Sequence, residues 1–299
     1  MIGMLKNTWT RRLGWLALCG VAVGAVAGCQ SWNAWLDAWR WKEAAKNPPA
    51  RLPPNLATVT PQPPVVGTGV VNAALLPRVT VLMITLPLGT FTGNNQIWAQ
   101  LNEDAIDSKT AVLMAQNGLR AATGAVVRWP AISKVLLEAP GAAAFPSVLQ
   151  TDGRTSIPVI TRQNALDQTV VSVDRDRVTQ GRSYERCDNG FRLAMRASQP
   201  RAGAPAELQL QLEPMVSLGS IQVIRPGVGV TGSTVAAEET FDDLRMTTSL
   251  TADQFLVICA LDPQSRTFSV GRLWLSDQEK VPATETVLVF VPTAAAAGM

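Results

Sequence analysis

The chain has 299 residues and contains no histidine. Without histidine, Ser-His-Asp and Cys-His nucleophilic catalysis, H-E-x-x-H zinc sites and every histidine metal ligand are excluded. The pattern S-x-x-K is absent as well, which removes the lysine-activated serine of penicillin-binding proteins. We therefore expect no enzymatic activity, no cofactor and no metal site, with an exported hydrolase built on two carboxylates as the one enzymatic alternative.

An excess of charge of either sign is also lacking. The chain has 26 lysines and arginines against 23 acids, and three of the cations, Lys6, Arg11 and Arg12, lie in the first 28 residues. Without those three, the remainder balances at 23 against 23. A nucleic-acid-binding surface needs concentrated positive charge, so we expect no nucleic-acid partner.

Residues 1–28 have the pattern of a secretory signal peptide. The basic stretch "MIGMLKNTWTRR" precedes the apolar run Leu13–Gly28. That run is diluted with Gly and Ala and is shorter than the roughly 20 residues a spanning helix needs, so cleavage is favoured over retention in the membrane.

The signal ends in Val26-Ala27-Gly28-Cys29, which resembles the lipobox of bacterial lipoproteins. The resemblance implies diacylglycerol attached to Cys29, acyl chains in the bilayer and, because Gln30 is not aspartate, a periplasm-facing position on the outer membrane. Ordinary secretion is the alternative, since Ala25-Val26-Ala27 also satisfies an A-x-A cleavage rule.

Residues 29–47 are predicted to form a Trp-rich amphipathic helix. Trp32, Trp35, Leu36 and Trp39 recur at helical spacing and share one face. Tryptophan is favoured at the membrane–water interface, so this face is expected to lie on the lipid bilayer beside the acyl anchor. Docking onto the protein's own domain or onto a partner helix is the alternative.

Residues 48–77 are predicted to be a Pro-rich linker, because seven prolines fall between Asn47 and Pro64. Such composition favours extended polyproline II. At about 3.1 Å per residue, it could hold a folded part roughly 50 Å from the membrane.

An α+β fold is expected after the linker. For residues 78–145 we predict a small α/β unit in the order strand, helix, strand, helix, with its two strands parallel as one option. Asn117-Gly118 should end the first helix, and Pro130 should lie near the start of the second.

Residues 146–292 are predicted to form a mainly antiparallel β domain, followed by a disordered tail at 293–299. "ELQLQLE" alternates as a half-buried strand does, and "TDGR" and "CDNGF" are turn signals. "FSVGRLWL" and "SIQVIRP" are counted among the strands, and "STVAAEETFDDLRM" as a helical interruption.

Several motifs in the folded part have competing interpretations. "GVGVTG" at 227–232 matches G-x-G-x-x-G, but its β-rich surroundings favour a loop over a dinucleotide site. "DRDR" at 174–177 is interpreted as a charged edge strand rather than a cation or phosphate site. Glu103, Asp104 and Asp107 are interpreted as acids that complement a helix dipole rather than as catalytic carboxylates.

The remaining cysteines, Cys187 and Cys259, leave two alternatives. A disulfide between them would suit an exported protein. Against it, Cys259 lies in the apolar strand "FLVICAL", where a free thiol behaves as a small hydrophobe.

The C-terminal half also resembles a degenerate secretin-like domain, from the outer-membrane rings of secretion and pilus machines. Residues 214–217, 254–259, 270–274 and 287–292 match short secretin segments in order, whereas the "VPxLGDIPxLG" motif is absent. The resemblance implies large homo-oligomers. We therefore expect a non-enzymatic envelope lipoprotein that binds or scaffolds an unidentified envelope protein, with a secretin-like ring subunit or accessory as the alternative.

Overall fold

The computed structural model describes residues 76–165, 167–198, 207–218, 237–262 and 268–293. The predicted signal peptide, the lipidation site Cys29, the Trp-rich helix, the motif at 227–232 and the segment 220–226 lie outside the described residues, as do all but 76 and 77 of the linker and all but 293 of the tail.

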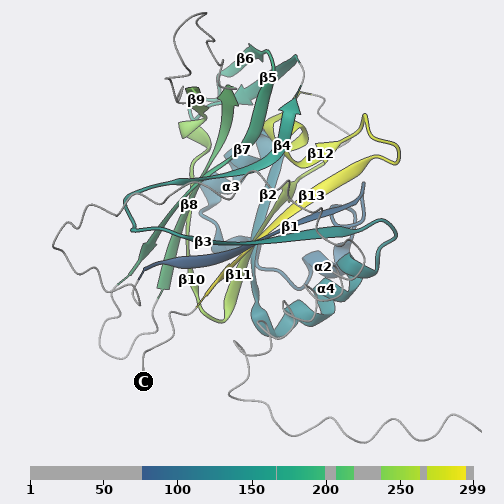
Figure 1. The fold of residues 1–299 in the computed structure, drawn as a ribbon, viewed down its shortest axis with the longest axis vertical. Coiled ribbons are helices and arrows are strands. Elements are labelled where there is room, and N and C mark those ends of the chain that lie inside the picture. The colour runs from purple at the N-terminus through teal and green to yellow at the C-terminus, as the bar shows by residue number, and fades with distance from the viewer. Residues whose placement is uncertain (1–75, 166, 199–206, 219–236, 263–267, 294–299) are drawn as a thin grey trace, which may run out of the picture.

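Two antiparallel sheets form the centre of the fold (Figure 1). The first, sheet A, has six strands in the order β2-β11-β13-β1-β3, with β12 paired to β13. Its strands are β1 (Arg78–Pro87), β2 (Leu119–Ala125), β3 (Ala143–Gln150), β11 (Gln254–Ala260), β12 (Ser276–Asp277) and β13 (Thr284–Pro292).

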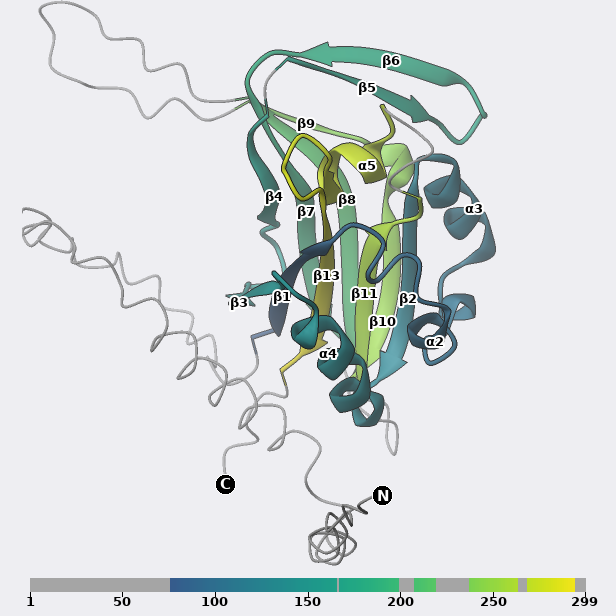
Figure 2. The same ribbon diagram turned by 90° about the vertical axis from the view of Figure 1, so that its right-hand side faces the viewer.

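The second, sheet B, has five strands in the order β10-β8-β7-β4, with β9 paired to β8. Its strands are β4 (Ile157–Ala165), β7 (Cys187–Ala197), β8 (Glu207–Leu218), β9 (Ala237–Thr240) and β10 (Met246–Thr251). A separate hairpin joins β5 (Gln168–Val173) and β6 (Thr179–Tyr184), and Figure 2 shows it at one end of the domain, above α5.

The helices are short. Besides α3 (Ser108–Gln116) and α4 (Trp129–Glu138), they are α2 (Asn95–Trp98), α5 (Val270–Leu275) and the 3-10 turns η3 (Glu103–Ala105), η4 (Val126–Arg128) and η5 (Asp242–Leu244). Among the residues described, no helix is long and apolar enough to cross a membrane.

Sheet A is covered on both faces. Leu256 and Phe290 pack with Phe191 and Leu212 of sheet B in one core. On the opposite face, side chains of β1, β11 and β13 pack with α2 and α4 in a second core, which contains Trp98, Trp129, Ile132, Leu136, Val257 and Val289. The layers are therefore helices, sheet A and sheet B, as Figures 1 and 2 show.

The pattern of buried and exposed residues along each strand follows from this layering. In β8, Leu208, Leu210 and Leu212 are buried between the sheets while Glu207 and Gln209 are exposed, so the predicted alternation is confirmed. In β11, all residues from Phe255 to Ala260 are buried, because neighbouring side chains enter different cores. The α+β class with mainly antiparallel strands is confirmed.

The predicted boundary at 145/146 is wrong. β3 runs through it, and β1 lies between β3 and β13, with Val79 opposite Pro292 and Thr293 N donating to Arg78 O at 3.0 Å. The predicted α/β unit and β domain therefore share one sheet. β1 and β2 are not neighbours, and every strand pair in the sheet is antiparallel, so the parallel option is also wrong.

Four local predictions are corrected. "FSVGRLWL" contains helix α5, because Ser269 caps it by accepting from Arg272 N. "CDNGF" lies within β7, and the charged stretch 174–177 is the turn between β5 and β6. In the described part of "STVAAEETFDDLRM", 237–240 is a strand and 242–244 a 3-10 turn.

Other local predictions are confirmed. Asn117 is the C-cap of α3, and Gly118 has φ of 75°. Pro130 lies in the first turn of α4. "TDGR" is a turn between strands, in which Gly153 has φ of 79°.

A buried carboxylate holds the loop between β1 and α2. Glu285 of β13 is 1% exposed and accepts hydrogen bonds from Phe91 N and from Thr92 Oγ1, the latter at 2.8 Å. Because both bonds join the loop to one buried side chain of β13, the loop is held against the end of sheet A.

We expect Glu285→Ala to lower the free energy of unfolding by about 2 kcal/mol, because Phe91 N–H would be left buried without an acceptor. Chemical denaturation measures this. Glu185→Ala, at an exposed position, is the matched control and should shift the value by less than about 0.5 kcal/mol. Equal effects of the two changes would contradict the role of Glu285.

Candidate binding cleft

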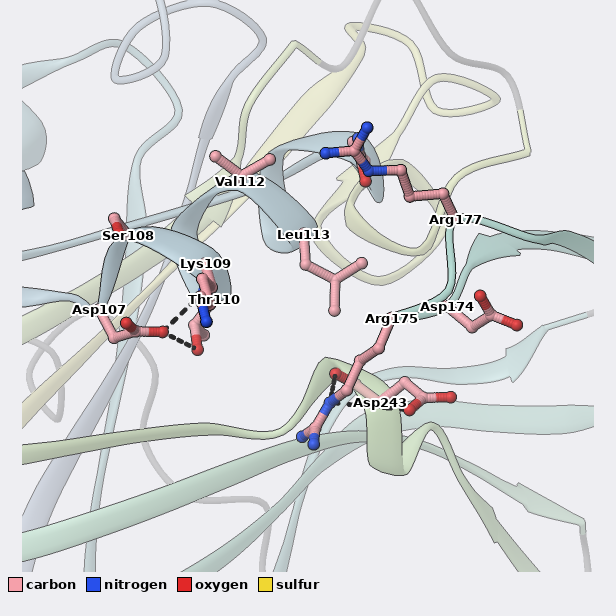
Figure 3. A pocket seen from close by; sticks show the side chains of 11 residues that line it. Asp107, Ser108, Lys109, Thr110, Val112, Leu113, Asp174, Arg175, Arg177 and Asp243 are labelled. Carbon is pink, nitrogen blue, oxygen red and sulfur yellow. Dashed lines mark hydrogen bonds and ion pairs between the residues drawn. The ribbon is translucent and has the colours of Figure 1, made fainter.

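A pocket with a volume of about 630 Å³ lies beside α3 (Figure 3). Pockets of this size are typical of ligand sites. Three elements line it: α3 with its N-cap, the β5–β6 turn and η5. The lining residues are Asp107, Ser108, Lys109, Thr110, Val112, Leu113, Gln116, Asp174, Arg175, Arg177 and Asp243.

One buried asparagine holds these elements together. Asn117, which is 1% exposed, donates from Nδ2 to Leu113 O and to Val173 O, both at 2.9 Å. Its Oδ1 accepts from Val173 N at 2.8 Å. The amide thus ties the end of α3 to the end of β5, which places the β5–β6 turn against the helix.

The backbone around Asn117 contacts α5. Asn117 O accepts from Gly271 N at 2.9 Å. A Cβ on Gly271 would overlap Gly118 O, so this close approach requires glycine at 271. We call Asn117, Gly118, Val173, Ser269 and Gly271 the Asn117 junction.

The β5–β6 turn is a tight hairpin loop of three residues. Arg177 N donates to Asp174 O and Asp174 N donates to Val178 O, each at 3.1 Å. Asp174 Oδ1 also accepts from Asp176 N at 2.9 Å and from Val178 N at 2.8 Å. Arg177 has φ of 64°, the left-handed position where such hairpins favour glycine.

Each of the three acids of the cleft has a hydrogen-bond or ion-pair partner within the fold. Asp107 caps α3, accepting from Thr110 N at 2.9 Å and from Thr110 Oγ1 at 2.8 Å, and these bonds lower its pKa. Asp174 holds the turn, and Asp243 forms an ion pair with Arg175 at 3.7 Å. These acids therefore have structural partners, and Asp107 is stabilised as an anion, which does not suit a general acid.

The two other acids singled out in the sequence, Glu103 and Asp104, lie in η3. Glu103 forms a two-point ion pair with Arg120, whose guanidinium stacks 3.5 Å from the Trp98 ring centroid. Hydrogen bonding to Arg120 lowers the pKa of Glu103. Asp104 lies in the first turn of η3, where an acid complements the helix dipole.

Cys187 and Cys259 are both free, so of the two alternatives the disulfide is not formed. Each is 1% exposed, Cys187 in the core between the sheets and Cys259 in the core beneath α2 and α4. Burial raises the pKa of Cys187 and raises that of Cys259 further. Buried thiols with raised pKa values are unreactive, so neither is a nucleophile.

A second pocket, of about 310 Å³, lies between β4, the start of β5 and α5. Arg162 on its wall forms ion pairs with Glu279 at 3.4 Å and with Asp277 at 4.0 Å. The guanidinium of Arg162 is thus paired within the fold. Within the described ranges, no group of His, Cys, Asp and Glu side chains could hold a metal ion.

Comparisons with known proteins give no relatives: no protein-family model, no curated protein and no solved structure matches the chain. The cleft therefore has to be interpreted from its own geometry. Sequence reasoning missed it, because "DRDR" was interpreted as part of a strand rather than as the turn between two strands.

We expect Asn117→Ala to lower the free energy of unfolding by about 2–4 kcal/mol, because Val173 N and Val173 O would lose their hydrogen bonds to the Asn117 side chain. Hydrogen exchange in β5 and β6 should also become faster. The control is Asn95→Ala at an exposed position of α2. A stable Asn117→Ala protein with unchanged exchange in the hairpin would contradict the junction's role.

We expect Arg177→Gly to raise the free energy of unfolding by about 1 kcal/mol, because glycine adopts a positive φ without steric cost. Thermal unfolding provides the measurement. Arg175→Gly in the same turn is the control and should be neutral or destabilising, because Arg175 lacks a positive φ and pairs with Asp243. Stabilisation by both changes would point to a cause other than φ.

Proposed function

We propose that the protein is a non-enzymatic lipoprotein of the bacterial envelope, whose folded domain binds or assembles a partner while tethered to the outer membrane. The observation that carries the proposal is Val26-Ala27-Gly28-Cys29 at the end of a basic and then apolar leader. The small residues, the cysteine and the apolar run stand at the spacing of a lipobox.

The sequence between Cys29 and the domain supports a tether. The tryptophans at 32, 35 and 39 would give the anchor a second contact with the lipid interface. The Pro-rich segment would then separate this contact from β1, which begins at Arg78. A domain held in this way can reach partners without lying on the bilayer itself.

Binding is favoured over catalysis by the chemistry of the described residues. The two thiols are buried, and their pKa values are raised. The acids of the large cleft hold turns, a helix end or an arginine. A carboxylate-based hydrolase would need two facing acids free to exchange protons, and these acids are already committed to structural partners.

The second candidate is a secretin-like ring subunit or accessory. Three of the four matched segments lie on strands, at 214–217 in β8, 254–259 in β11 and 287–292 in β13. The fourth, 270–274, lies in α5. This candidate requires a large homo-oligomer, whereas the tethered module requires none.

Intact mass of the membrane-extracted protein tests the proposal. We expect a chain that starts at Cys29 and carries added acyl mass, recovered in the outer-membrane fraction. Cys29→Ala should lose the acyl mass and leave that fraction, whereas Cys187→Ala should change neither. A mature chain that starts at Gly28 without added mass would overturn the lipoprotein proposal.

Sizing of the detergent-solubilised particle separates the two candidates. A monomer or small oligomer agrees with the tethered module. A ring of many subunits would overturn it in favour of the secretin-like candidate.

A further inference from the structure

We propose that β3 is an interface between two copies of the chain. In this dimer the two β3 strands pair antiparallel about a two-fold axis at Ser147, which joins the two copies of sheet A edge to edge. The proposal goes beyond the binding module proposed above and does not depend on how that module is attached to the membrane.

The first argument is a row of main-chain groups on the outer edge of β3. β3 is the last strand of sheet A and pairs with β1 alone. Just after it, Thr151 N donates to Pro77 O at 3.2 Å, so residue 151 faces β1. Successive residues of a strand direct their main-chain groups to opposite sides, so every second residue before Thr151 faces away from β1. These residues are Ala144, Pro146, Val148 and Gln150. Their main-chain groups form no hydrogen bond to another strand within the described ranges, so this edge is a template for a further extended chain.

The second argument is the apolar character of this edge. Phe145 is 54% exposed and Val148 is 49% exposed. Among the exposed large apolar side chains of the described ranges, these are the two that lie on a strand. β3 also contains no charged residue. Because charge is a common protection of edge strands against pairing, an apolar edge without charge is suited to being covered.

The third argument is the contrast with the other sheet edges. The opposite edge of sheet A, β2, is covered at Thr123, whose N donates to Asn102 O at 2.9 Å and whose O accepts from Asn102 N at 2.7 Å. In sheet B, the edge strand β4 has register shifts on both sides of Arg162, and the exposed residues of β10 are Thr247 and Ser249. The edge of β3 has no covering bridge, no register shift and no charge within the described fold.

The fourth argument identifies the occupant, because one antiparallel register matches β3 with itself. This register places Ser147 opposite Ser147 of the second copy. Phe145 then lies opposite Leu149 of the second copy, and Val148 lies opposite Pro146. Both exposed apolar side chains therefore gain an apolar neighbour across the interface, and each pair occurs twice by symmetry.

Pro146 restricts the pairing to such a register. A proline has no N–H, so a register with Pro146 opposite Pro146 of the second copy would leave both carbonyl groups without a donor. In the proposed register, Val148 N–H faces Pro146 O of the second copy. Ala144 and Gln150 lie opposite each other and can exchange both of their hydrogen bonds.

The position of the chain before β1 permits this pairing on one membrane. Arg78, the first residue of β1, lies opposite Gln150 in the β1–β3 pair. In the proposed dimer the two β1 strands would therefore begin about 25 Å apart. Since the Pro-rich segment could extend roughly 50 Å, two anchored copies can meet edge to edge.

The first test is sedimentation equilibrium of the full-length protein in density-matched detergent. We expect a reversible dimer. Phe145→Lys with Val148→Lys should raise its dissociation constant at least about tenfold, because edge lysines oppose strand pairing. The matched control is Val127→Lys with Val135→Lys, which changes two exposed valines of η4 and α4 and should alter the constant by less than about twofold.

Cross-linking tests the register. Opposite residues of a pair without main-chain hydrogen bonds have Cα atoms about 4.5 Å apart, within the range of a disulfide. Mild oxidation of Ser147→Cys should therefore give a covalent dimer. Gln150→Cys, at another exposed position of β3, is the control and should stay monomeric on a non-reducing gel, because its two copies would lie about 20 Å apart. The unsubstituted protein corrects for any cross-link through other cysteines.

Three results would overturn the proposal: a monomer at every concentration, a dimer that the lysines in β3 do not weaken, or cross-linking of Gln150→Cys as readily as Ser147→Cys. A monomer would leave the edge to a strand of a different protein. None of these results changes the acyl mass expected at Cys29. Conversely, absence of acyl mass would remove the tether while the dimer stood.

Discussion

The whole fold depends on the requirement that both faces of sheet A be covered. β11 and β13 are apolar on each side, so Leu256 and Phe290 need one apolar layer and Val257 and Val289 need another. Sheet B provides the first layer and α2 with α4 the second. This explains why segments far apart in sequence, β1 and β13, lie side by side at the centre.

The Asn117 junction extends this arrangement to the cleft. Neither core reaches the β5–β6 turn directly, so the position of the turn depends on a few directed hydrogen bonds. Asn117 satisfies the last carbonyls of α3 and the end of β5 with one amide, and Gly271 allows α5 to approach closely. A polar side chain that is fully satisfied can thus orient a hairpin where apolar packing alone would not.

Local patterns were predictable from the sequence wherever one short-range rule decides the structure. Continuous apolar runs identified β11 and β13, alternation identified β8, and Asn117-Gly118 marked the end of α3. Pairing between distant strands was not predictable, since no pattern in "RVTVLMITLP" specifies β13 as its neighbour. The division into two domains failed for that reason.

Two of the misassigned segments have tertiary explanations. A short, mainly apolar run such as that of α5 is equally compatible with a strand or with a short helix. The close approach of Gly271 to Gly118 favours the helix. Asn189 and Gly190 suggest a turn, but Asn189 is buried and bonded to Gln168, and a Cβ at Gly190 would crowd Val159 O of β4. The cleft itself was unpredictable because α3, the β5–β6 turn and η5 come together only in the folded chain.

The pairing of Arg78 with Thr293 has a mechanical consequence. The domain is entered through β1, which is bonded along its length to β13 on one side and β3 on the other. A force that pulls on the chain before Arg78 therefore acts directly on β1. Both hydrogen-bond ladders, the one to β13 and the one to β3, would have to open before β1 left the sheet. The strand at which the described domain begins is thus also a strand held on both sides.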